Sequence, residues 1–169
     1  MRPILATICL GVTVAQALPA PEDRPAFKLS ISLDHSTVAP NAEVAINVTI
    51  TNLSEKEMFL FRTSRGMPPY RFSIVDQKHR PVPLTRLGQA LVDGRTEYTN
   101  EKGERRVMLG GGAPKAVPPK GELNDVFPIS YFVHLSRPGR YTIRLQRQDP
   151  YTELAVESNP ITLIVTKPK

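Results

Sequence analysis

The side chains best suited to binding chemistry are three arginines near the C-terminus, Arg137, Arg140 and Arg144. A guanidinium group donates paired hydrogen bonds to carboxylates and phosphates. On one strand, residues 140 and 144 would lie about 13 Å apart at roughly 3.3 Å per residue. That separation fits two separate anionic groups, on a protein or on a surface polymer. The alternative is that these charges only keep an exposed strand soluble.

Catalytic side chains are sparse in the sequence. The three histidines, His35, His79 and His134, stand alone, and neither a G-x-S-x-G nor an H-E-x-x-H motif occurs. Hydrolysis by a Ser–His–Asp set and metal binding each need several groups held together. We therefore expect no catalytic residue, metal site or cofactor. A small metal-binding or hydrolytic protein is the least favoured alternative.

The first residues follow the pattern of a secretory signal peptide. Arg2 precedes an apolar run over residues 4–14, and Ala15-Gln16-Ala17 provides a cleavage site. The run is shorter than the roughly 20 residues that span a bilayer. Residues 1–17 are thus predicted to direct export to the periplasm or beyond and to leave no membrane span after cleavage. An uncleaved anchor or a first buried strand is the alternative.

Composition and charge narrow the class of protein. The chain has 40% hydrophobic residues, a globular value, and a formal net charge of +6. Its one cysteine, Cys9, lies in the signal segment, so a cleaved chain would have no disulfide. Acidic and basic residues are interleaved, without the basic stripe and aromatic residues of a nucleic-acid site. We expect a monomer without specific nucleic-acid binding.

Period-two alternation predicts most of the chain as strands. Residues 18–26, with three prolines, form a flexible linker, and a single domain follows over residues 27–167. Alternating strands are expected at residues 27–33, 44–51, 57–62, 70–74, 141–145 and 161–166. Another is expected over residues 125–135, with Phe127, Ile129, Tyr131 and Val133 on one face and Pro128 at an edge or bulge. This predicts an all-β sandwich of about seven or eight antiparallel strands.

Two segments interrupt the strand pattern. Residues 85–92 predict one short helix, because Leu84, Leu87 and Leu91 recur at helical spacing, with Thr85 as cap and Gly94 as end. Residues 93–122 are polar and rich in glycine and proline, a long polar loop. They are expected to hold a hairpin around Lys102-Gly103 or, alternatively, to be a mobile functional loop.

A corner precedes the penultimate strand. Pro138 presets one backbone angle and Gly139 permits a positive φ, so the pair predicts a tight turn. Tyr141 then begins a strand with Tyr141, Ile143 and Leu145 on its buried face. This arrangement resembles the tyrosine corner of immunoglobulin-like sandwiches, in which the hydroxyl bonds to the backbone upstream. An ordinary Pro-Gly hairpin is the alternative.

The strand and corner motifs resemble small bacterial secreted domains of the immunoglobulin-like class. The matching stretches are residues 37–54, 70–85, 118–123, 135–147 and 157–165. The first three are also similar to the intracellular proteinase inhibitor family, except that its D-x-x-G turn reads Asp76-Gln77-Lys78-His79 here. The resemblance implies a sandwich fold and places no inhibitory loop. We predict a non-enzymatic exported interaction module, with a proteinase inhibitor as the alternative.

Overall fold

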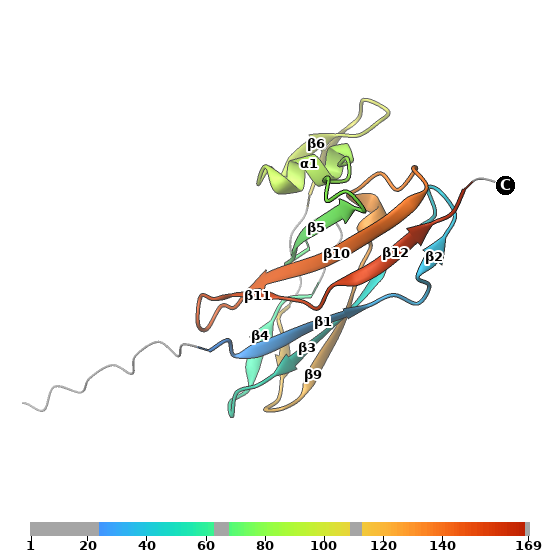
Figure 1. Cartoon of the computed structure of the whole chain (residues 1–169). Coiled ribbons are helices and arrows are strands. Elements are labelled where there is room, and N and C mark those ends of the chain that lie inside the picture. The colour runs from blue at the N-terminus through green and yellow to red at the C-terminus, as the bar shows by residue number, and fades with distance from the viewer. Residues whose placement is uncertain (1–23, 63–67, 109–112, 168–169) are drawn as a thin grey trace, which may run out of the picture.

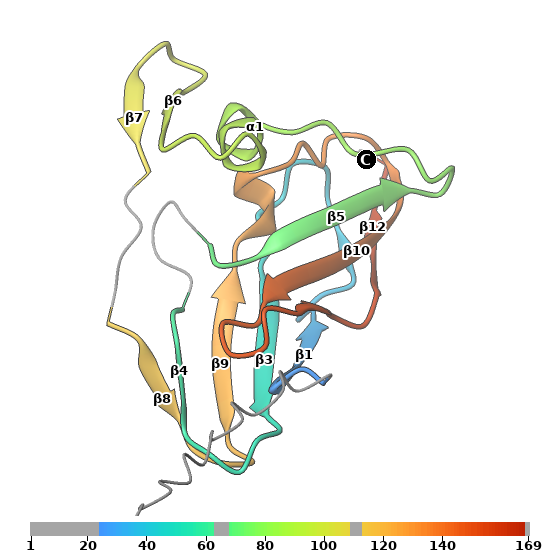
Figure 2. The same ribbon diagram turned by 90° about the vertical axis from the view of Figure 1, so that its left-hand side faces the viewer.

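The computed structural model describes residues 24–62, 68–108 and 113–167. The predicted signal peptide and most of the predicted linker lie outside these residues. Two β-sheets face one another, and the strands of one run obliquely across those of the other (Figures 1 and 2). One sheet is antiparallel and has the order β1-β3-β9, formed by Phe27–Ser32, Ile46–Asn52 and Glu122–Phe127.

The second sheet is built around β10 (Gly139–Gln148). On one side β10 pairs with β5 (Arg71–Asp76), and on the other with β12 (Ile161–Val165) and β11 (Ala155–Glu157), all antiparallel. The outermost strand, β2 (Thr37–Val38), pairs with β12 in parallel. This strand was not expected, because two residues in a predicted turn segment carry too little pattern to reveal a strand.

The core lies between the sheets and follows the predicted alternation. In β3, Ile46, Val48 and Ile50 are buried, and in β10 Tyr141, Ile143 and Leu145 face them from the opposite layer. Each large apolar side chain so buried contributes about 1.5–3 kcal/mol. The all-β sandwich prediction is confirmed.

Two short strand pairs lie outside the main sheets. β4 (Met58–Leu60) pairs with β8 (Lys115–Val117), and β6 (Glu97–Thr99) pairs with β7 (Arg105–Val107). The β6–β7 hairpin turns at Gly103, whose φ of +81° suits glycine, and projects from the body (Figure 2). The hairpin expected around Lys102-Gly103 within residues 93–122 is confirmed.

The predicted helix is α1 (Arg86–Val92). The hydroxyl of Thr85 accepts a hydrogen bond from the Gly88 amide at 3.0 Å, as its capping role requires. Gly94, at φ +68°, ends the helix by donating its amide to the carbonyl of Leu91. Gly88 faces the carbonyl of Phe132, and a Cβ there would lie 1.9 Å from that oxygen. The described residues hold no helix long and apolar enough to cross a membrane.

The strand expected over residues 125–135 was wrong beyond Phe127. β9 ends there, and Pro128 is followed by a 3-10 turn, η1 (Ile129–Tyr131). Pro128 has no amide to continue the ladder, so the chain changes direction instead of bulging. Ile129 stays buried, whereas Tyr131 is 54% exposed and leaves the predicted apolar face.

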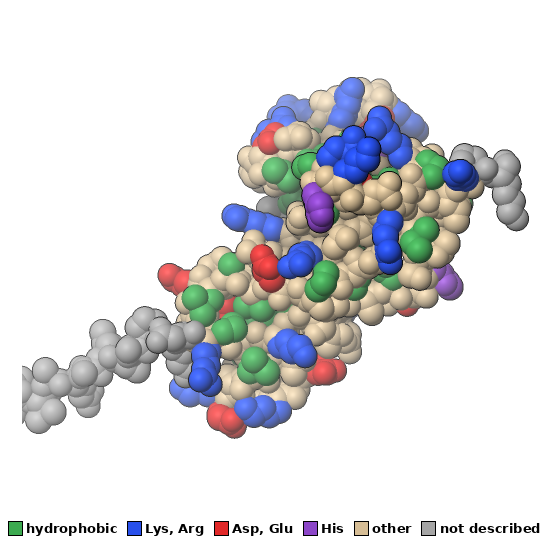
Figure 3. Space-filling model, viewed as in Figure 1, with side chains coloured by type: hydrophobic (Ala, Val, Ile, Leu, Met, Phe, Trp, Pro, Cys, Tyr) green, Lys and Arg blue, Asp and Glu red, His purple; other side chains and the backbone are tan. Residues whose placement is uncertain are grey.

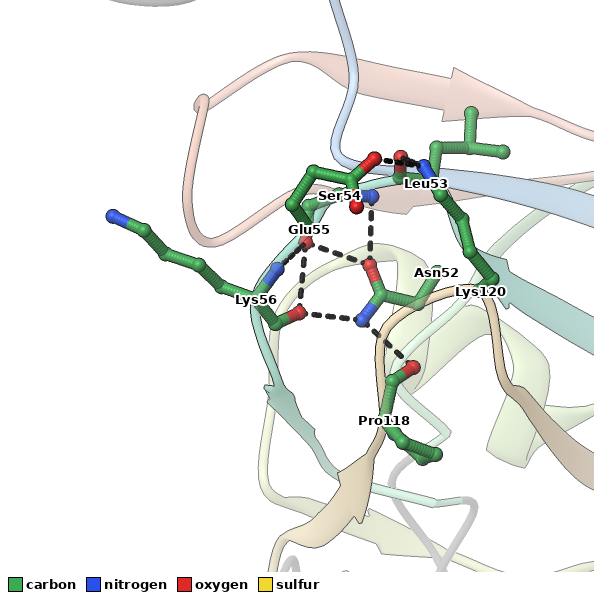
Figure 4. Close-up of polar contacts among 7 residues, drawn as sticks. All are labelled: Asn52, Leu53, Ser54, Glu55, Lys56, Pro118 and Lys120. Carbon is green, nitrogen blue, oxygen red and sulfur yellow. Dashed lines mark hydrogen bonds and ion pairs between the residues drawn. The ribbon is translucent and has the colours of Figure 1, made fainter.

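A buried amide fastens the end of β3 to the loop between β8 and β9 (Figure 4). The side-chain nitrogen of Asn52 donates to the carbonyls of Lys56, Val117 and Pro118 at 2.8–3.0 Å. Its oxygen accepts from the amide and hydroxyl of Ser54 at 2.9 and 2.8 Å. Asn52 therefore uses its whole hydrogen-bonding capacity inside the fold, and its role is structural.

Candidate functional site

The corner before β10 is held by Tyr141. Its ring is buried, and its hydroxyl donates a 2.6 Å hydrogen bond to the carbonyl oxygen of Arg137. Burial raises the pKa of this hydroxyl, and the nearby carboxylate of Asp76 raises it further. Gly139 does not have the positive φ that the Pro-Gly pair was expected to use. It lies instead against the Tyr141 ring, where a Cβ would be 3.8 Å from the hydroxyl oxygen.

A second turn, between β5 and residue 81, lies beside this corner. One carboxylate oxygen of Asp76 accepts hydrogen bonds from Nε and Nη2 of Arg80 at 2.9 and 2.7 Å. The other accepts the amides of Lys78 and Arg80 at 2.8 and 3.0 Å. The hydrogen bonds from Arg80 lower the Asp76 pKa to about 2. His79 completes the turn at φ +59°, in the position of the glycine in D-x-x-G.

The turn and the corner enclose an open groove of about 480 Å³. Proline rings and cationic side chains line it. We call it the corner groove; its lining includes Asp76, Arg80, Pro81, Pro83, His134, Arg137, Arg140 and Tyr141. Lys and Arg side chains gather at this end of the molecule, beyond β10 and over α1 (Figure 3).

Pairing with carboxylates separates the arginines of the described residues into two groups. Arg62, Arg80, Arg95, Arg105, Arg106 and Arg144 each lie within ion-pair distance of an acidic side chain. No such pair with the residues that the structure describes is made by five exposed arginines, Arg24, Arg71, Arg86, Arg137 and Arg140. Of these five, Arg137 and Arg140 line the corner groove. The corner groove therefore presents two cationic side chains whose hydrogen-bond donors are open to a ligand.

The structure brings together two of the three predicted binding residues. Arg137 and Arg140 line the corner groove, whereas Arg144 does not. Arg144 points from the middle of β10 toward Glu157 on β11, at 3.7 Å. Arg137 and Arg140 thus share one groove, whereas Arg144 lies beside an acidic side chain.

Sequence reasoning missed a buried polar cluster between the two sheets. The Tyr70 hydroxyl donates to the Asp125 carboxylate at 3.0 Å, and Arg147 lies over the Tyr70 ring at 5.4 Å. Arg62 reaches Asp125 from the other side at 3.6 Å. Burial, followed by the charge of Asp125, raises the Tyr70 pKa above its usual value, so the hydroxyl stays protonated. The alternation of β9 and β10 places Asp125 and Arg147 inward, and that signal could have revealed them.

The three histidines do not belong to a group of metal-ligating side chains within the described residues. His35, His79 and His134 are exposed, the last in the corner groove. Within the described ranges, no three His, Cys, Asp or Glu side chains are grouped closely enough to hold a metal ion.

Neither a protein-family model nor a curated protein matches this sequence. Among solved structures, the chain is similar to the Pseudomonas fluorescens alkylpurine DNA glycosylase AlkC bound to DNA containing an abasic site analog. The alignment covers 85% of this chain and 31% of that one, at 6% identity and a TM-score of 0.41. A likeness of this size identifies no function.

Proposed function

We propose that this protein is a non-enzymatic, exported, immunoglobulin-like interaction module that binds an anionic group of its partner in the corner groove. The observation that carries the proposal is the pair Arg137 and Arg140. Both residues line the groove, and neither side chain makes an ion pair with a carboxylate of the described residues. A partner's carboxylate can accept their donors without displacing an existing ion pair.

A carboxylate is the anion that we propose for the groove. The Asp76 carboxylate also lines the groove and is ionised near neutral pH, because its pKa is about 2. It is engaged by the guanidinium group of Arg80, so it leaves the donors of Arg137 and Arg140 to a ligand. An acidic segment of a protein or a uronic-acid polymer would supply such a carboxylate.

Export rests on residues 1–17. The short positive start, the apolar run and the Ala15-Gln16-Ala17 site direct the chain across a membrane and are then removed. Mass spectrometry of the protein recovered from the periplasm or medium of its host tests this step. The mature chain should begin at Leu18, and an intact Met1 would contradict it.

Titration of purified protein with fluorescently labelled poly-L-glutamate and with labelled polygalacturonate tests the binding. We expect the fluorescence anisotropy of at least one labelled polymer to rise as protein is added and to fall with added salt. The double variant R137A/R140A should bind about tenfold more weakly, the equivalent of about 1.4 kcal/mol. The matched control R95A/R106A removes the same charge from paired arginines and should bind as the wild type. Equal weakening by both variants would reject the groove.

The β6–β7 hairpin is the observation that favours the alternative, a proteinase inhibitor. β6 and β7 project from the body, and Arg105 pairs with Glu97 across the two strands. An inhibitor presents such a stiffened segment to a protease cleft. Slowing of a serine, cysteine or metalloprotease at micromolar concentration would favour this alternative, and no effect on all three classes would remove it.

A further inference from the structure

The outer edge of β5 is only partly covered. β5 is the last strand of its sheet on this side, since β10 is its sole strand partner within the described ranges. The returning segment after the Asp76 turn covers one end of the edge. The Asp76 amide donates to the carbonyl of Arg80 at 2.9 Å, and the Val82 amide donates to that of Ile74 at 3.1 Å.

The part of the edge that no described residue covers is at Phe72. Phe72 lies opposite Leu145 of β10. The backbone of Leu145 bonds to Ser158 on its other side, through its amide at 3.0 Å and its carbonyl at 2.9 Å. Phe72 and Leu145 thus form a non-hydrogen-bonded pair, in which both backbones point away from each other. The amide and carbonyl of Phe72 therefore face outward, as those of Ile74 and Asp76 do.

Comparable positions on two other strands are sealed by side chains. On β1, the Asn159 side chain accepts from the Ile31 amide at 2.9 Å and donates to its carbonyl at 3.0 Å. On β4, the Tyr151 hydroxyl accepts from the Phe59 amide at 2.7 Å. Such caps prevent an exposed strand from pairing with another chain. No described residue caps Phe72 in this way.

A groove of about 830 Å³ reaches this edge. It is lined by Arg71 and Phe72 of β5, by Leu91 and Val92 at the end of α1, and by Gln146 and Gln148 of β10. α1 lies above β5 in Figure 2. Val92 is 62% exposed, although it is apolar. Arg71 is exposed and makes no ion pair with the part of the chain that the structure describes.

We propose that the edge of β5 binds an extended segment of a partner protein as an added strand. The outward amide and carbonyl of Phe72 pair with the backbone of the segment. An apolar side chain of the segment packs against Leu91 and Val92. An acidic side chain next to it meets Arg71, which makes the preferred segment alternately apolar and acidic. This site is separate from the corner groove, which contacts only the far end of β5.

Two-dimensional ¹H–¹⁵N NMR of the whole exported domain tests the site, with the peptide acetyl-Thr-Val-Glu-Val-Thr-Val-amide as probe. We expect the peptide to shift the amide resonances of Phe72 and Val92 in a saturable manner. The same peptide with Lys in place of Glu should bind several-fold more weakly. A peptide with Pro in place of the Val that follows Glu should not bind, because proline has no backbone amide to donate.

Matched variants separate this site from other apolar surfaces. Val92→Asp should weaken binding about tenfold, an effect of about 1.4 kcal/mol. Val107→Asp places the same charge at an exposed valine of the hairpin and should leave binding unchanged. R137A/R140A should also bind the peptide normally, whatever its effect on anionic polymers. Absence of shifts at Phe72 with millimolar peptide, or equal loss in V92D and V107D, would overturn the proposal.

Discussion

The phenol of Tyr141 holds the backbone of Arg137 through a single hydrogen bond of 2.6 Å. This contact fixes the corner from which Arg137 and Arg140 extend over the groove. Tyr141 therefore contributes to the stability of the sandwich through its buried ring. Through its hydroxyl it also fixes the geometry of the proposed binding site.

Removing the Tyr141 hydroxyl should destabilise the domain and disturb binding. Tyr141→Phe keeps the buried ring but leaves the Arg137 carbonyl without its donor, which costs about 1–2 kcal/mol. Urea denaturation measures the change. Tyr131→Phe is the matched control, because Tyr131 is 54% exposed and its hydroxyl makes no hydrogen bond with the described residues. Equal stability of the two variants would show that the corner bond contributes nothing.

The buried Asn52 should be among the least replaceable polar residues. Asn52→Ala leaves the carbonyls of Val117 and Lys56 without their donor and creates a small cavity, so we expect a loss of about 2–4 kcal/mol. Asn47→Ala, on the same strand, removes one exposed hydrogen bond to Asp34 and should cost less than about 1 kcal/mol. Thermal unfolding of both proteins gives the comparison. Similar melting temperatures would contradict the structural role of Asn52.

The stability of the Gly88→Ala variant shows whether helix propensity or packing against Phe132 dominates at this position. In an exposed helix the change gains about 1 kcal/mol, because glycine is a poor helix former. Here the new Cβ would lie 1.9 Å from the Phe132 oxygen, so α1 must move away from the core and the domain should lose at least about 2 kcal/mol. Gln89→Ala, on the exposed side of α1, should change stability by less than about 0.5 kcal/mol. A stabilised Gly88→Ala protein would mean that α1 is not packed here.

The strands with long alternating patterns could be predicted from the sequence, and two of the short ones, β2 and β8, could not. β1, β3, β5, β10 and β12 each place several apolar residues two apart, so the pattern identifies both the strand and its buried face. β2 has two residues and β8 has three, too few to distinguish a strand from a turn. Pro128 was expected at an edge or bulge inside a strand, but the strand ends at Phe127 and a 3-10 turn follows.

The site was predictable only in part, since its residues meet across the chain. Arg137, Arg140 and Arg144 are equivalent as sequence, but the register between β10 and β11 gives Arg144 a partner in Glu157. The Asp76 turn that forms the other wall of the groove comes from residues 76–83, and nothing in its local pattern points to the corner. Such pairings follow from tertiary packing, which no single segment encodes.

Acid should weaken the Asp76 turn over a defined range. Its carboxyl has a folded pKa of about 2 against 3.8 for the unperturbed group, so the unfolded chain binds its proton first. The stabilisation is present above about pH 4 and is lost as the pH falls toward 2. The difference in unfolding free energy between wild type and Asp76→Asn should therefore shrink across this range. A constant difference from pH 6 to pH 2 would contradict the assignment.

The corner groove itself is tested most directly by mapping where a carboxylate polymer binds. NMR shifts of ¹⁵N-labelled protein titrated with short poly-L-glutamate, and separately with oligogalacturonate, locate the contact. If the polymer binds in the corner groove, the shifts concentrate at Ser136, Gly139 and Tyr141 and disappear in R137A/R140A. Shifts centred on the β6–β7 hairpin, or unchanged in that variant, would contradict it.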